Sequence, residues 1–170
     1  MKEISDINGK AIAWVQPDWR KYEFEIRAGQ DLIGSLAWEK IFGSLAIARS
    51  ADGVWTFQRG GLHQPWVAIR AEGQDWDIAR FRFNWNSSGL LTLHDGRQLR
   101  WGISNLVWRW EWDETTPIIS IKADPQQEKI EGSIQIHPQA KSVIAPSLLA
   151  LLGCYIVVLT WEEMSAALAS

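Results

Sequence analysis

Hydrophobic and polar residues alternate along most of this chain with a period of two, the spacing of a β-strand with one buried and one exposed face. Tyr22, Phe24 and Ile26, for example, alternate with charged residues. Turn-forming pairs such as Asp52-Gly53 and Gly60-Gly61 separate the alternating segments, and the short connections favour antiparallel neighbours. The pattern predicts strands at about residues 11–15, 21–28, 31–38, 44–49, 54–59, 66–70, 76–85, 89–93, 97–103, 106–112, 118–122 and 130–136.

The segment from Ser142 to Trp161 has a different character, because it contains no charged residue. Pro146 suits the first turn of a helix, and apolar residues then occur all the way round a helical wheel, so this helix needs burial on every side. Its length would also span a bilayer. The flanks, Lys141 on one side and Glu162 with Glu163 on the other, are unlike those of a membrane anchor. We therefore expect a buried helix at about 146–163 and no transmembrane insertion.

The strands and the helix fit together in one architecture. A barrel of about eight strands is filled by its own side chains, whereas a barrel of about twelve has a wider interior that needs a plug. Closed barrels with a central helix are one solution. The sequence therefore predicts a mainly β fold, a single domain over residues 1–170: a closed antiparallel barrel of about twelve strands around a hydrophobic C-terminal helix.

Composition supports a folded domain with a large core. The chain of 170 residues is long enough to bury a core without disulfides, and it contains twelve tryptophans. The alternation groups most of these indoles with Phe, Leu and Ile rather than with charged residues, so we expect most of them to be buried.

Charge and cysteine content limit the partners and the compartment. The net charge of −3 gives no general attraction for nucleic acid, which makes a nucleic-acid partner an unfavoured interpretation. The single cysteine, Cys154, rules out an internal disulfide and fits a reducing compartment. Residues 1–10 are polar and lack the apolar core of a secretory signal. These features predict a cytoplasmic protein.

The order of elements resembles the tubby-like and LURP-one-related family, to which phospholipid scramblases are also similar. The resemblance rests on the stretch Tyr22-Glu-Phe-Glu-Ile26, on the hairpin from Arg49 to Phe57 and on the leucine-rich segment from Leu148 to Leu159. It implies a twelve-stranded barrel around a hydrophobic helix. It also implies lipid or phosphoinositide association in the tubby branch and membrane-linked roles in the scramblase branch. No dense Lys/Arg cluster, multi-cysteine run or acidic calcium loop matches the family, so its binding residues find no positions here.

Metal and cofactor motifs are not found. The sequence contains no Gly-x-Ser-x-Gly, P-loop or Gly-x-Gly-x-x-Gly motif, and its three histidines have no paired metal-ligand spacing. These are His63, His94 and His137. Cys154 lies inside the apolar helix, where a thiol is most often an inert small hydrophobe. We expect no cofactor and no metal.

Two acidic pairs could act as the general acid and base of a glycoside hydrolase. They are Asp75 with Asp77 and Glu111 with Asp113, each flanking a tryptophan. Charged residues that alternate with apolar ones are usually the solvated face of a strand, so a hydrolase is the alternative rather than the leading interpretation.

Arginines and aromatic residues are interleaved between residues 76 and 112. Guanidinium groups beside aromatic rings can bind phosphates or stack on bases, but the alternation places most of the two kinds on opposite faces of the strands. The candidate anion contacts on the outer face are Arg80, Arg82 and Arg109.

The sequence as a whole predicts a non-enzymatic binding or scaffold module, with weak and salt-sensitive affinity for anionic lipid head groups or with a protein partner. A carbohydrate-binding module that uses exposed tryptophans is another alternative, because sugar rings stack on flat aromatic faces.

Overall fold

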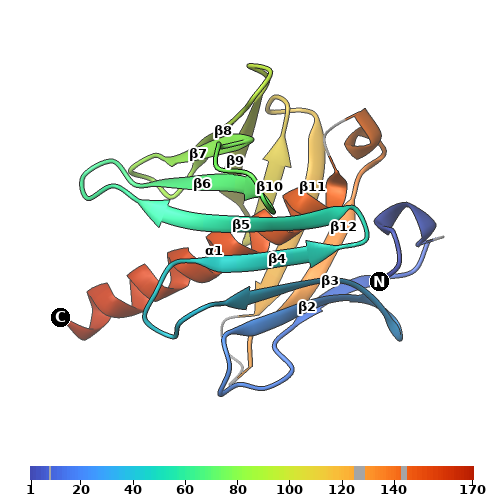
Figure 1. Cartoon of the computed structure of the whole chain (residues 1–170), viewed down its shortest axis with the longest axis horizontal. Helices are drawn as coiled ribbons and strands as arrows, with labels where there is room; N and C mark the ends of the chain where they lie inside the picture. The colour runs from blue at the N-terminus through green and yellow to red at the C-terminus, as the bar shows by residue number, and fades with distance from the viewer. Residues whose placement is uncertain (8, 125–128, 143–144) are drawn as a thin grey trace.

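The computed structural model describes residues 1–7, 9–124, 129–142 and 145–170 of the chain. It is a closed barrel of antiparallel strands around one long helix, shown in Figure 1. The strands are β1 (Ile12–Val15), β2 (Glu23–Ala28), β3 (Asp31–Trp38), β4 (Ala46–Ser50), β5 (Gly53–Gly60), β6 (Trp66–Ala71), β7 (Ala79–Phe83), β8 (Gly89–Leu93), β9 (Gln98–Ser104), β10 (Val107–Glu111), β11 (Pro117–Asp124) and β12 (Glu131–Ile136). The helices are η1 (Ile4–Asp6), η2 (Pro138–Ser142) and α1 (Pro146–Ala169).

Each strand pairs with the next one along the chain, and β1 pairs with β12 to close the barrel. Ile12 lies opposite Ile134 at this closure. The predicted barrel is confirmed, and every predicted strand overlaps an observed one. The largest difference is at β7, predicted from residue 76 but beginning at Ala79, because residues 72–78 form the turn and loop after β6.

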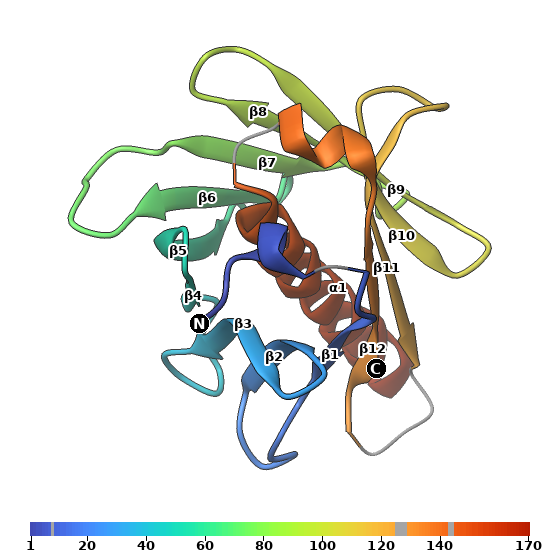
Figure 2. The ribbon, with the colours of Figure 1, turned by 90° about the vertical axis from the view of Figure 1, so that its right-hand side faces the viewer.

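Helix α1 runs through the barrel, and Figure 2 shows the strands arranged around it. All residues from Ser147 to Thr160 are buried, which confirms the predicted central helix. The helix continues to Ala169, six residues past the predicted end at 163, and its last turns extend beyond the strands into solvent. By length and composition alone α1 could cross a membrane, but 78% of its most apolar window is buried inside the barrel.

The two ends of the barrel are distinguished by the helix. At the end where α1 begins, the Ser147 hydroxyl donates a hydrogen bond to the Asp52 carboxylate in the β4–β5 turn. A carboxylate at a helix N-terminus is favourable for the helix dipole. At the other end Glu163 of α1 forms an ion pair with Arg59 of β5. We call the first the entry end and the second the exit end.

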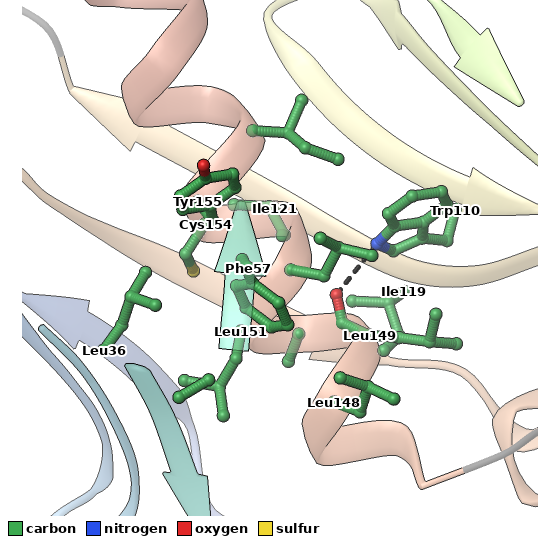
Figure 3. Close-up of a cluster of buried hydrophobic side chains, with 14 of the residues drawn as sticks. Leu36, Phe57, Trp110, Ile119, Ile121, Leu148, Leu149, Leu151, Cys154 and Tyr155 are labelled. Atoms are coloured by element: carbon green, nitrogen blue, oxygen red, sulfur yellow. Dashed lines mark hydrogen bonds between the residues drawn. The ribbon is translucent and has the colours of Figure 1, made fainter. Parts of the chain in front are cut away.

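Tryptophans make up much of the barrel wall that faces α1. Six of them are buried, namely Trp14, Trp38, Trp55, Trp101, Trp108 and Trp110. Trp66, Trp112 and Trp161 are half-buried. The exposed tryptophans are Trp19, Trp76 and Trp85. Figure 3 shows part of the core, in which Trp110 and Ile121 of the wall pack against Leu149 and Tyr155 of α1.

Candidate ligand-binding surfaces

Arg80 and Arg82 lie on the outer face of β7 and line one shallow depression. Arg80 is already engaged there, because its Nη2 lies 2.7 Å from the Asp77 carboxylate and its guanidinium stacks 4.5 Å from the centre of the Trp66 ring. Arg70 pairs with the same carboxylate at 2.8 Å. Partial burial works against the ionised form of Asp77, but the hydrogen bonds from Arg70 and Arg80 outweigh it, so the pKa of Asp77 lies below its ordinary value.

Arg109 lies on β10, three strands round the barrel from β7, and faces a different depression. With strands about 4.8 Å apart this is roughly 14 Å along the sheet. The structure therefore brings Arg80 and Arg82 together and leaves Arg109 apart, so the three predicted residues do not form one site.

In each of the two predicted acidic pairs, one carboxylate is held by neighbouring groups: Asp77 in the first pair and Asp113 in the second. Asp77 is held between two arginines, while Asp75 is exposed in the same loop. Asp113 accepts hydrogen bonds from the backbone N–H of Thr115 at 2.9 Å and from its hydroxyl at 2.8 Å. These bonds lower the pKa of Asp113. A carboxyl held ionised in this way is a poor general acid. Neither the depression beside Arg80 nor the one beside Arg109 is lined by both carboxylates of a pair, so these surroundings do not support a hydrolase.

The single cysteine and the three histidines lie in separate parts of the fold. Cys154 is buried, and this burial raises the pKa of its thiol, as expected of an inert core cysteine. His63 lies in the β5–β6 loop, His94 in the β8–β9 turn and His137 directly after β12. Within the described part of the chain, no three His, Cys, Asp or Glu side chains come together as metal ligands.

The exposed tryptophans do not form a common platform. Trp76 lies at the entry end and packs edge-on against His94 with 5.0 Å between ring centroids. Trp19 and Trp85 lie on the β1–β2 and β7–β8 loops at the exit end. Because these rings come from separate connections and from both ends of the barrel, they do not make the flat stacking surface that a carbohydrate-binding module uses.

The surface that sequence reasoning missed is at the exit end. Five connections between consecutive strands there carry exposed large hydrophobic side chains at or near their tips. We call these side chains, with two more from the last turns of α1, the apolar rim. It consists of Trp19, Ile41, Phe42, Leu62, Trp85, Leu106, Met164 and Leu168. Phe42 and Trp85 are exposed to 103% and 99% of their reference areas, so these rings have almost no contact with the rest of the protein.

Leu106 shows that this arrangement has a conformational cost. Its φ is 62° in the two-residue β9–β10 turn, a left-handed conformation that bulky residues rarely adopt. Glycine would fit this position without strain, yet the chain has an exposed leucine there. A strained and solvent-exposed apolar residue is typical of a functional surface rather than of a stability requirement.

Apolar hollows lie beside the emerging helix. One of about 500 Å³ is lined by Ile103, Leu106, Trp108, Trp161, Met164 and Leu168, among others. The loops at 61–65, 84–88 and 105–106 contain no Asp, Glu, Lys or Arg. The loops that carry Leu62, Trp85 and Leu106 are therefore uncharged. The loops that carry Trp19 and Phe42 also contain charged residues, namely Asp18, Arg20, Lys21, Glu39 and Lys40.

The acidic residues of α1 at this end are partly screened from solvent. Burial and the nearby Glu162 raise the pKa of Tyr22 to about 12. Burial also raises the pKa of Glu162, although its interaction with Tyr22 opposes the shift. The neighbouring Glu163 is neutralised by Arg59. At the exit end, the positive charge of Arg59 therefore offsets the negative charge of Glu163.

Comparison of the chain with protein-family models, with curated proteins and with solved structures found no match, so these surfaces are interpreted from their own chemistry.

Proposed function

We propose that this protein is a non-enzymatic binding module of the tubby-like type that attaches peripherally to lipid bilayers through its apolar rim, while α1 stays inside the barrel. The observation that carries the proposal is that five separate loops place large hydrophobic side chains in solvent at the same end of the barrel. A flat bilayer surface can contact such loop tips together.

The chemistry of the rim favours a bilayer. An apolar side chain that moves from water into the acyl region gains roughly 1.5–3 kcal/mol when fully transferred, so even partial insertion of several tips yields measurable binding. Tryptophan rings such as Trp85 and Trp19 prefer the membrane–water interface, because the indole has an apolar body and one polar N–H. The uncharged loops 61–65, 84–88 and 105–106 suit a zwitterionic surface, since they have no charge to desolvate.

The closed barrel around a hydrophobic helix is what supports assignment to the tubby-like type, and lipid association agrees with what that resemblance implies. The proposed mode of contact differs from attraction to anionic head groups by the outer arginines. The single, buried Cys154 supports a reducing compartment such as the cytoplasm.

The test is flotation of the purified protein with phosphatidylcholine vesicles. We expect the wild type to float with the vesicles and to do so equally at low and physiological salt, because apolar contacts are not screened. The double variant Phe42→Ser/Trp85→Ser should remain in solution. Trp76→Ser is the matched control, because it also removes an exposed tryptophan but at the entry end.

Two results would overturn the proposal. One is failure of the wild type to float with these vesicles. The other is equal flotation of the wild type and of the folded double variant, which would show that the rim is not the contact surface.

A further inference from the structure

A polar depression of about 630 Å³ lies on the outer wall of the barrel over β10, β11 and β12. Its hydrogen-bond donors stand in register on adjacent strands. Arg109 lies opposite Ser120, which lies opposite Gln135, and Lys122 lies opposite Ser133. The imidazole of His137 completes the lining.

Arg109 is the central residue of this depression, because its side chain is half-buried and is not engaged by a carboxylate of the described residues. Arg70, Arg80 and Arg100 each pair with a carboxylate, whereas no carboxylate of the described residues lies within ion-pair distance of Arg109. Glu114 also borders the depression, but its side chain is 82% exposed and lies 3.7 Å from Arg100. A half-buried guanidinium without a counter-ion attracts anions more strongly than a solvated one, because water screens it less.

His137 and Ser120 form a second polar group beside Arg109. The Ser120 hydroxyl and His137 Nε2 are 2.9 Å apart. Burial and the charge of Arg109 hold the pKa of His137 below its ordinary value, so the imidazole is neutral near pH 7. The charged groups of the described residues that line the depression with it are Arg109, Lys122 and Glu114. A bound anion would favour the imidazolium form and raise the pKa of His137.

We propose that this depression binds a phosphate group through Arg109 and Lys122, with Ser120, Ser133, Gln135 and His137 supplying further hydrogen bonds. The planar guanidinium can donate two parallel hydrogen bonds to a phosphate, the ammonium adds a point charge, and the hydroxyls and amide can reach the remaining oxygens. The site is on the side wall of the barrel rather than on the apolar rim, so it does not depend on the proposed membrane contact.

The first experimental arm is an NMR titration of the histidine ring protons with inorganic phosphate, with sodium chloride at equal ionic strength as the control. We expect selective shifts of His137 and a rise of its titration midpoint, while His63 and His94 stay unchanged. Arg109→Ala should weaken phosphate binding about tenfold or more, since a hydrogen-bonded charged partner is lost. Arg49→Ala is the matched control, because Arg49 is an exposed arginine on β4 and lies outside the depression.

The second arm separates a soluble phosphate ester from a lipid head group. Wild type and Arg109→Ala are floated with phosphatidylcholine vesicles with and without phosphatidic acid. If phosphatidic acid adds binding that Arg109→Ala removes, the phosphate can be a lipid head group. If binding of inorganic phosphate depends on Arg109 but phosphatidic acid adds no binding to vesicles, the site takes a soluble phosphate group rather than a lipid head group. If Arg109→Ala behaves like the wild type in both arms, the phosphate site does not exist, whatever the vesicles without phosphatidic acid show about the rim.

Discussion

The indole nitrogen of Trp110 in β10 donates a hydrogen bond of 2.8 Å to the backbone carbonyl oxygen of Leu149 in α1 (Figure 3). This bond joins the barrel wall to the central helix inside an apolar core. Both residues are fully buried, and the bond satisfies the one polar atom that the Trp110 side chain brings inside.

Trp110→Phe should therefore lower the free energy of unfolding by about 1 kcal/mol more than Trp101→Phe does. Trp101 is a fully buried tryptophan on the neighbouring strand β9, and its indole nitrogen has no hydrogen-bond partner among the described residues. Chemical denaturation of both variants measures the difference. Equal losses would mean that the bond to Leu149 adds nothing to stability.

Gly132 of β12 provides a second test of close packing. A Cβ atom at this position would overlap the carbonyl oxygen of Lys122 and the indole nitrogen of Trp14, two groups that are themselves hydrogen-bonded at 3.0 Å. Gly132→Ala should destabilise the protein by about 1–3 kcal/mol or more, because backbone atoms must shift. Gly102→Ala is the control, since a Cβ there meets nothing within 4 Å. A thermal melt of Gly132→Ala that matched the wild type would contradict the register of β11 and β12.

The barrel was predictable because its two signals are strong and agree. Alternation fixes which side chains of a strand face inward, and a helix that is apolar on every side must be buried. Together they required a barrel wide enough to contain Leu148 to Leu159. The start of β7 was harder to predict, because Trp76 and Ile78 continue the alternation although the chain there is still in the loop after β6.

The surfaces were less predictable than the core. Strand alternation places Arg80 and Arg109 on the outer face. It does not say that Asp77 pairs with Arg80 while no carboxylate of the described residues pairs with Arg109. That outcome depends on contacts between neighbouring strands and loops. The apolar rim did leave a sequence signal, a large hydrophobic residue inside turns that favour polar ones, as in Asn84-Trp85-Asn86. That signal has meaning only when alternate turns are recognised as sharing one end of the barrel.

Deletion of residues 146–170 should abolish folding, whereas deletion of 164–170 should leave the fold intact. The first removes every buried side chain of α1, and each large one contributes roughly 1.5–3 kcal/mol. Their sum exceeds the ~5–15 kcal/mol net stability of a typical domain. The second removes only exposed residues. Circular dichroism with thermal melting measures both, and a cooperatively melting β-protein without residues 146–170 would show that the barrel does not need its helix.

Stability should depend on the ionisation of Glu162. Because burial raises its pKa in the folded state, its contribution is fully present below its ordinary value of 4.5 and is lost as the pH rises through the raised pKa. Glu162→Gln should therefore melt at a higher temperature than the wild type at pH 7, with the difference shrinking toward pH 4. Glu163→Gln should instead lower the melting temperature at pH 7, because it breaks the ion pair with Arg59. The same melting temperature for wild type and Glu162→Gln across this range would reject the burial of this carboxylate.

The most direct measurement of the proposed function is hydrogen–deuterium exchange of the whole protein with and without phosphatidylcholine vesicles. The proposal predicts slower exchange on vesicles in the exit-end loops 39–45, 61–65 and 84–88, and no change in the entry-end turns 51–52 and 94–97. Residues 147–160 should remain protected in both states, because the helix stays inside the barrel. Slower exchange at the entry end, or a loss of protection in 147–160, would contradict peripheral attachment through the apolar rim.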